Sequence, residues 1–281
     1  MNSFTRRRFL RLGGGALLSS VLAGTAALSY ANLIEPQHLV LERRRIRLTH
    51  LDPALDGLRI ALMSDHHLFP FTPKKLLEAA VEQTNALRAD LVLLAGDYVY
   101  THAESIRELG PILGRLNAKY GVFAVLGNHD HALDSDQLIC DQLRAQSIEV
   151  LINRGLHTGP LGRLFLAGLD SVYKGDPDPA KAFAAYHEGN VAIALVHEPD
   201  YFSTLARLIP VDLQLSGHSH GGQIRIPSLG PPILPKWGRI YHSGLYKLGE
   251  RIVYTSRGLG LVGLPLRLAC PPELTETTLV A

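Results

Sequence analysis

The chain has 281 residues, of which 46% are hydrophobic and 19% are charged, with a formal net charge of +2. Four of the 28 basic residues and none of the acidic ones lie in residues 1–31, so the rest of the chain carries 24 basic against 26 acidic side chains. This balance excludes the overall basic excess of a nucleic-acid-binding protein, and no nucleic-acid partner is expected. Residues 32–281 are long enough for one large α/β domain with a sizeable core.

The first 31 residues have the pattern of an export signal. The basic motif Thr5-Arg6-Arg7-Arg8-Phe9-Leu10-Arg11 precedes an uncharged run over residues 12–28, and Ser29 and Ala31 are small residues of the kind that a signal peptidase recognises. The motif resembles a twin-arginine signal. That resemblance implies export of the folded chain by the twin-arginine machinery to the periplasm or cell envelope, after any metal has been loaded in the cytoplasm. Cleavage is favoured, and retention as an anchor stays open because ~17 apolar residues are at the short end of what spans a bilayer.

The cysteines and one run of arginines limit the kinds of site that the chain can form. Cys140 and Cys270 are the only cysteines, which excludes a disulfide framework or a thiolate metal site, and both are predicted to be unpaired. Residues 39–48 alternate in polarity, so the arginines at 43–45 and 47 are predicted to form the solvated face of a strand, with contact to an anionic surface as the alternative.

The first half of the chain predicts alternating strands and helices. Residues 58–63 form an apolar strand that ends at Asp65-His66-His67. Residues two apart in an extended segment face the same way, so Asp65 and His67 are predicted to converge on one cation while His66 points elsewhere. An apolar loop over 68–73 leads to a predicted helix from Pro73 to Leu87.

Two more strands of this half end in polar residues. A strand over 91–95 ends at Gly96-Asp97, and one over 122–126 ends at Gly127-Asn128-His129-Asp130. Helices are predicted over 103–116 and 135–146. Open α/β sheets bind their ligands at the carboxyl ends of their strands, where all of these side chains would gather.

The second half continues the pattern. Strands are predicted over 150–151 and 164–169, with a turn between them, and turn chemistry accounts for the acidic residues at 170, 176 and 178. A strand over 191–196 ends at His197. A strand over 211–215 leads to His218 and His220, which are flanked by glycines that let the backbone bend tightly. Imidazoles two apart in such a turn favour metal ligation.

The C-terminal part contains loops and a sheet edge. Residues 227–239 hold four prolines and the only tryptophan, Trp237, and are predicted to be irregular, as a flap or a lipid-facing lip. Residues 241–254 predict an antiparallel pair turning near Gly249. Arg257 either meets a phosphate or caps carbonyls of its own loop. Residues 266–268 and 274–280 are predicted to close a sheet edge.

The predicted ligands are oxygen and nitrogen donors only, and there are more of them than one tetrahedral site needs. They suit two divalent cations, Mn, Fe or Zn, that share a carboxylate. Two cations ~3.5–4 Å apart clamp the attacking and leaving oxygens of an in-line phosphoryl displacement and make hydroxide available near neutral pH. The ligand inventory is Asp65, His67, Asp97, Asn128, His197, His218 and His220.

The order Asp-x-His, Gly-Asp, Gly-Asn-His-Asp, solitary His and Gly-His-x-His over residues 58–226 resembles the calcineurin-like metallophosphoesterases. The resemblance implies a four-layer α-β-β-α sandwich with two central mixed sheets. It implies one metal held by Asp65, His67, Asp97 and His220, and another held by Asp97, Asn128, His197 and His218, with Asp97 as the bridge. His129 would then stabilise the phosphate or protonate the leaving oxygen, and Asp130 would orient His129 by accepting its second proton.

Two departures from the family pattern bear on the shape of the predicted pocket. Leu68-Phe69 stands where many members have glycine, so the lip of the pocket should be bulkier and more apolar, and no long insert supplies a capping domain. With the export signal, the chain resembles exported phosphodiesterases, whose relatives act on lipid-linked nucleotide diphosphates. The leading hypothesis is a phosphodiesterase with a metal-bridging hydroxide, with Phe69, Phe71 and Trp237 as apolar surface for a lipid or envelope substrate. An exported phosphomonoesterase and a non-catalytic metal-binding envelope protein are the alternatives.

Overall fold

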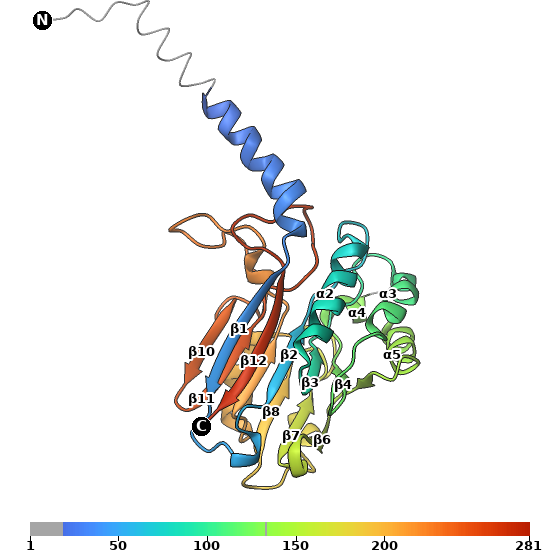
Figure 1. The fold of residues 1–281 in the computed structure, drawn as a ribbon, viewed down its shortest axis with the longest axis vertical. Helices are drawn as coiled ribbons and strands as arrows, with labels where there is room; N and C mark the ends of the chain where they lie inside the picture. Colours follow the sequence, from blue (N-terminus) through green and yellow to red (C-terminus); the bar gives the residue numbers. More distant parts are fainter. Residues whose placement is uncertain (1–18, 133) are drawn as a thin grey trace, which may run out of the picture.

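The computed structural model describes residues 19–132 and 134–281. The predicted twin-arginine motif at residues 5–11 lies outside the described residues. Residues 19–29 are α-helical and continue through a π-helical turn, Tyr30–Ile34, and a 3-10 turn, Glu35–Gln37. This helix projects from one end of the domain (Figure 1). Among the described residues, no helix has both the length and the apolar character needed to cross a membrane.

Two six-stranded sheets form the centre of the domain, with strand orders β1-β12-β2-β3-β4-β5 and β10-β11-β9-β8-β7-β6. Both sheets are mixed, because β12 pairs parallel to β1 and antiparallel to β2, while β10–β11 and β6–β7 are antiparallel pairs. The strands of the first sheet are β1 Val40–Arg47, β2 Arg59–Met63, β3 Leu91–Leu94, β4 Val122–Ala124, β5 Glu149–Val150 and β12 Glu273–Val280. Those of the second are β6 Arg154–Thr158, β7 Leu164–Gly168, β8 Val191–Leu195, β9 Leu213–Ser216, β10 Gly244–Leu248 and β11 Arg251–Thr255.

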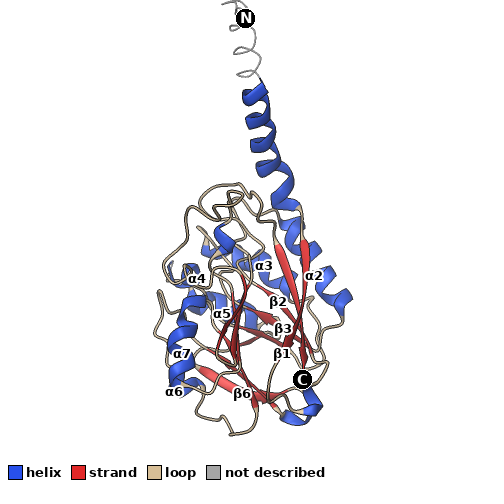
Figure 2. Cartoon of the chain, turned by 90° about the vertical axis from the view of Figure 1, so that its left-hand side faces the viewer, coloured by secondary structure: helices blue, strands red, loops and turns tan. Residues whose placement is uncertain are grey.

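Helices cover the outer face of each sheet. One apolar core joins the first sheet to α2 (Lys74–Leu87), α3 (Ile106–Leu113) and α5 (Asp136–Arg144), and another joins the second sheet to α6 (Pro179–Ala182) and α7 (Phe202–Leu208). A third core lies between the sheets, where inward side chains of β2, β3, β8 and β9 meet. The central strands are buried on both faces, which explains why their sequences are continuous apolar runs. The strands therefore lie between two helical layers (Figure 2), and the predicted four-layer fold is confirmed.

Short helical segments complete the chain, and most of them lie at strand ends. They are α4 Asn128–Ala132 and the 3-10 turns Pro53–Leu55, Ala103–Ser105, Pro160–Gly162, Pro199–Tyr201 and His220–Gly222.

The structure corrects two strand predictions. Residues 154–158, predicted as part of a connection, form β6, because their backbone pairs antiparallel to β7 across the turn at 159–163. Residues 274–280 belong to β12, which lies inside the first sheet, and β1 takes the edge position instead. The sequence of β6 does not alternate in polarity, so local periodicity does not reveal this strand. The place of β12 depends on its pairing with β1, near the start of the chain, which no local pattern shows. As predicted, the arginines of β1 face solvent, and Arg43 pairs with Glu276.

Candidate metal centre

The seven predicted ligands gather where the carboxyl ends of the two sheets meet. Asp65 and His67 follow β2, Asp97 follows β3, and Asn128 begins α4 after β4. His197 follows β8, and the last two histidines follow β9. Hydrogen bonds join neighbouring strand ends, from the amide of Asp65 to the carbonyl of Gly96 at 3.0 Å and from the amide of Gly217 to the carbonyl of His197 at 3.1 Å. The site is thus assembled by sheet pairing.

Six of these side chains form two clusters, each with its ligand atoms within 4.8 Å of one another. In the first cluster, Nε2 of His220 lies 3.1 Å from Nε2 of His67 and 3.4 Å from Oδ1 of Asp65. In the second, Nε2 of His197 lies 3.1 Å from Oδ2 of Asp97. Two imidazole nitrogens that face each other at this separation need a cation or a proton between them. The clusters are Asp65, His67 and His220, and Asp97, His197 and His218.

Asp97 lies between the two clusters. Its Oδ2 atom is 3.4 Å from Nε2 of His67, in the first cluster, and 3.1 Å from Nε2 of His197, in the second. Its Oδ1 atom accepts a 2.8 Å hydrogen bond from the amide of His129. A carboxylate in this position can serve two cations at once, as the predicted bridge requires.

The distal ring nitrogens fix which atoms of the histidines face the centre. Nδ1 of His67 donates to the carbonyl of Val99 at 3.1 Å, and Nδ1 of His197 donates to the carbonyl of Ala95 at 2.6 Å. Nε2 of His218 donates to the carbonyl of Lys236 at 2.7 Å. These bonds hold each ring in the tautomer whose other nitrogen has a free lone pair, as is usual for metal-ligating histidines.

Several ligand atoms lack a hydrogen-bond partner, and two bound cations would satisfy them. Oδ1 of Asn128, Nε2 of His197 and Nδ1 of His218 are buried and have no hydrogen-bond partner in the described part of the chain. Unpaired buried polar atoms are costly, so their convergence needs an explanation. Carboxylate, amide and neutral imidazole ligands fit Mn, Fe or Zn.

Electrostatics in the protein favour the ligand states of His67 and Asp97. Burial lowers the pKa of His67 to about 3, which keeps its imidazole neutral. Burial alone would raise the pKa of Asp97, but the neighbouring His197 and His129 bring it well below its ordinary value. Burial raises the pKa of Asp65 to about 6, so that a cation in the first cluster would compete with a proton for this carboxylate. Burial would lower the pKa of His197, but the charge of Asp97 raises it well above its ordinary value, so a cation in the second cluster would have to displace a proton.

The backbone at the ligands is not extended, which corrects the physical reason given for Asp65 and His67. Both have positive φ, 53° and 41°, and so do Asp97 and His220, at 56° and 51°. Such conformations are uncommon outside glycine and cluster at functional sites. Asp65 and His67 do share one cluster, while His66 points away and stacks on Tyr98. Consecutive tight bends, rather than strand alternation, bring them together.

Gly127 and Gly217 allow close approach of the backbone to ligand carboxylates. A Cβ atom on Gly127 would overlap Oδ1 of Asp97, and one on Gly217 would overlap Oδ2 of Asp65. Only glycine fits at either position.

Asp130 does not accept a proton from His129, which corrects its predicted role. Its Oδ2 accepts from the amides of Asp97 and Gly127, both at 2.8 Å, and its Oδ1 accepts from the amides of Tyr98 and Val99, at 2.8 and 3.4 Å. Burial, with the charge of Asp97, raises the pKa of Asp130 to about 7. Asp130 therefore ties the loop after β3 to the loop after β4 and positions Asp97.

His129 lies beside the first ligand cluster, and its side chain does not make the predicted contact with Asp130. Its ring packs against those of His67 and Tyr100, with centroids 4.9 and 5.1 Å away. It borders the cavity described next, so it can reach a group bound there.

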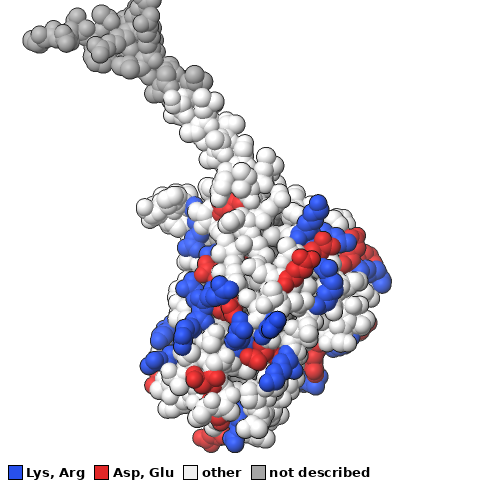
Figure 3. Space-filling view, in the orientation of Figure 1, with Lys and Arg blue, Asp and Glu red and all other residues white. Residues whose placement is uncertain are grey.

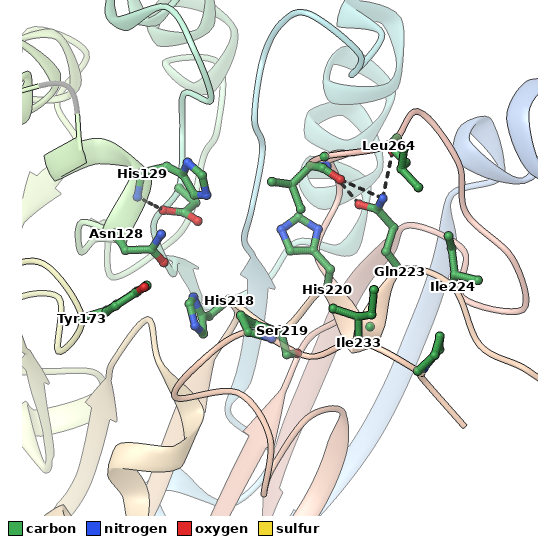
Figure 4. Close-up of a pocket in the computed structure, with 16 residues that line it drawn as sticks. Asn128, His129, Tyr173, His218, Ser219, His220, Gln223, Ile224, Ile233 and Leu264 are labelled. Carbon is green, nitrogen blue, oxygen red and sulfur yellow. Dashed lines mark hydrogen bonds between the residues drawn. The ribbon is translucent and has the colours of Figure 1, made fainter. Parts of the chain in front are cut away.

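A cavity of about 390 Å³ opens from the two ligand clusters (Figure 4). One wall carries Asp97, Asn128, His129, His218 and His220. The opposite wall is apolar and is formed by Ile224, Pro232, Ile233, Pro235, Val262 and Leu264. The predicted apolar contacts Phe69, Phe71 and Trp237 are absent from the described lining, and other residues supply the apolar surface of this cavity.

Tyr173 was not predicted as a site residue, yet it lines the cavity beside Asn128 (Figure 4). The buried carboxylate of Glu198 holds its loop, accepting from Ser171 Oγ at 2.6 Å and from the amides of Val172 and Tyr173 at 2.9 and 3.3 Å. In the sequence, the only indication of this arrangement is that Glu198 directly follows the predicted ligand His197.

A second tie to the Tyr173 loop comes from α4. His131 Nε2 lies 2.8 Å from Oδ1 of Asp170. Asp170 also accepts from the amides of Ser171 and Asp176, as its predicted turn role requires.

Arg257 takes neither of its predicted roles. It pairs with Glu42 at 3.0 Å and with Glu273 at 2.9 Å. The buried Arg267 caps the carbonyls of Arg257, Gly258 and Gly260 instead. As predicted, Cys140 and Cys270 are unpaired.

A two-sheet sandwich with two clusters of metal-ligating side chains around a shared aspartate is the architecture of a metal-dependent phosphoester hydrolase. Residues 58–222 match the family of calcineurin-like phosphoesterases, and the chain belongs to this family. The two clusters are consistent with its binuclear divalent metal centre.

Several relatives cover the chain almost completely. It is 33% identical to the uncharacterized metallophosphoesterase YkuE of Bacillus subtilis, over 99% of both chains, and 33% identical to the phosphodiesterase YaeI of Escherichia coli, over 98% of this chain and 99% of YaeI. It is 28% identical to the UDP-2,3-diacylglucosamine pyrophosphatase LpxG of Chlamydia muridarum, over 95% and 97%. The structure of Haemophilus influenzae NAD nucleotidase shares the fold, with a TM-score of 0.51 and 17% identity over 73% of this chain and 46% of that one.

Proposed function

We propose that this hydrolase is a phosphodiesterase that acts on a lipid-linked or cell-envelope phosphodiester. The observation that carries the proposal is the cavity, which joins the ligand clusters to an apolar wall. The phosphodiesterase YaeI and the diacylglucosamine pyrophosphatase LpxG, as relatives over nearly the whole chain, support diester and lipid-linked substrates respectively.

The residues of the chain have distinct tasks in this reaction. Two bound divalent cations supply Lewis-acid activation of the phosphoryl group and a hydroxide near neutral pH. Asp65, His67 and His220 would hold one cation and Asn128, His197 and His218 the other, with Asp97 shared. His129, which borders the cavity and has no side-chain hydrogen bond in the described structure, would stabilise the phosphate or protonate the leaving oxygen.

The test uses the full chain loaded with divalent cations. Metal content is measured together with hydrolysis of bis(p-nitrophenyl) phosphate and of p-nitrophenyl phosphate. His129→Ala should lower kcat by about 10²–10⁴-fold with metal content unchanged, whereas Asp97→Asn should lower both. His102→Ala removes an exposed histidine and serves as the control.

The outcomes separate the alternatives. Faster turnover of the monoester would indicate an exported phosphomonoesterase. Full metal content with turnover of neither ester would favour a metal-binding envelope protein. For the lipid part, Ile233→Ser with Leu264→Ser should lower kcat/KM for a long-chain phosphodiester and spare the water-soluble one; equal effects on both would rule it out.

We also propose export by the twin-arginine machinery to the periplasm or cell envelope. The support is the sequence motif at residues 5–11. Replacing both Arg6 and Arg7 by Lys should leave the protein in the cytoplasmic fraction, and unchanged export would refute the proposal.

A further inference from the structure

Four uncharged segments meet at the end of the domain that carries the cavity. Residues 19–34, 68–73, 226–235 and 258–266 contain no Asp, Glu, Lys or Arg, in a chain of which 19% is charged. The 68–73 segment follows the ligand His67, and the 226–235 and 258–266 segments together supply most of the apolar wall of the cavity.

Hydrogen bonds join these segments to one another. The amide of Leu261 donates to Oγ1 of Thr72 at 3.0 Å, which links 258–266 to 68–73. Nε2 of Gln223, just before the 226–235 loop, donates to the carbonyls of Val262 and Leu264 at 3.0 and 2.9 Å. The three loop segments therefore form one connected surface at the mouth of the cavity.

The N-terminal helix is fixed to the same surface. The carbonyl of Ala31 accepts from the amide of Arg267 at 2.9 Å, and Oε1 of Glu35 accepts from the amide of Cys270 at 2.6 Å. Ala31 and Glu35 are each 3% exposed, so the base of the helix is part of the fold. Figure 1 shows the helix rising beside the loops that precede β10 and β12.

Large apolar side chains are exposed on this surface in the described part of the chain. We define the apolar rim as Ile226, Leu229, Ile233 and Leu264, which are exposed by 42, 81, 80 and 57%. On the adjoining helix, Leu33 and Ile34 are exposed by 64 and 57%. In Figure 3 the helix and the loop beside its base are mostly white, while charged side chains of both signs lie on the body below. Contiguous exposed apolar surface of this kind marks an interaction site.

We infer that this end of the domain docks on a lipid bilayer containing anionic phospholipids, with the apolar rim and the base of the N-terminal helix in contact with it. The helix carries no charged side chain, and Val21, Leu22 and Leu28 are exposed on it, so that it offers apolar surface to lipid. The uncharged segments are bordered by the exposed Lys75 and Lys236, which suit anionic headgroups. The cavity then opens at the level of the headgroups. This docking does not depend on which phosphoester is cut.

The test places an environment-sensitive NBD fluorophore on the full chain at Leu229→Cys and, as a control, at Leu161→Cys. The two native residues are similarly exposed, at 81 and 84%, but Leu161 lies in the turn between β6 and β7, at the end of the strands opposite the cavity. Cys140 and Cys270 are buried and should not be labelled. Vesicles of phosphatidylcholine and phosphatidylglycerol, with and without doxyl-labelled lipid, are the probe.

Docking predicts a several-fold rise and blue shift of emission at position 229, quenched by doxyl lipid, with little change at position 161. Equal changes at both positions would overturn the inference, and so would no change at 229 while the chain sediments with the vesicles, since the helix would then be only a tether. Failure to bind vesicles would also overturn it. Hydrolysis of the water-soluble diester in the same samples reports separately on the proposed function.

Discussion

Replacing Asp130 by Asn should destabilise the fold rather than disable His129 alone. The carboxylate accepts hydrogen bonds from four buried backbone amides, two at each oxygen. An asparagine keeps one accepting oxygen and turns an NH₂ group toward the other pair of donors. Two unsatisfied buried amides cost about 2–6 kcal/mol of unfolding free energy. For a domain of this size that corresponds to a fall in Tm of roughly 5–20 °C.

The assay is thermal unfolding followed by circular dichroism, on the metal-free and the metal-loaded chain. Asp136→Asn removes an exposed carboxylate from the start of α5 and controls for loss of charge. An Asp130→Asn variant that unfolds within about 2 °C of the parent while losing turnover would refute this stabilising role. That result would restore the predicted action of Asp130 on His129.

Three further changes test other contacts of the site. Gly217→Ala should displace Asp65 and lower metal content, whereas Gly110→Ala, whose Cβ would meet nothing closer than 3.6 Å, should retain it; equal metal content in both variants would contradict the close approach. Glu198→Gln should loosen the Tyr173 loop and raise KM for the diester more than it lowers kcat, which steady-state kinetics would detect; an unchanged KM would count against a substrate contact by Tyr173. His131→Gln should cost most stability between about pH 4 and 6.5, measured by urea unfolding. Burial opposes both shifts, but pairing raises the pKa of His131 and lowers that of Asp170. The contribution of His131 is therefore lost as pH rises through its raised pKa, and that of Asp170 is lost as pH falls through its lowered pKa. A pH-independent difference would refute the ion pair.

Strand ends were the part of the site that sequence predicted best. Each ligand follows an apolar run, and parallel strands bring their carboxyl ends to one edge, so Asp65, Asp97 and His197 could be placed together without coordinates. The reason given for His67 was nevertheless wrong, because positive φ angles at both Asp65 and His67 replace the extended backbone. Local patterns show where a strand stops but not how the chain bends afterwards.

Roles that depend on a hydrogen-bond partner far along the chain were predicted less well. Asp130 and Arg257 were assigned to plausible neighbours in sequence or to a ligand, but they bind backbone amides at 97–99 and the carboxylates of Glu42 and Glu273. A buried polar side chain pairs with the group that packs beside it, and this neighbour is set only when the sheets assemble.

Residue patterns alone predict oxygen and nitrogen ligands at the strand ends, because ligand type and strand-end position are local properties of each segment. The tertiary structure decided the rest. Sheet pairing placed β12 inside the first sheet and created β6, and the loops at 224–235 and 262–264 formed the apolar wall that had been expected from Phe69, Phe71 and Trp237. Which side chains border a cavity, and which remain exposed beside a helix, depends on contacts between segments far apart in the chain, and no local pattern records them.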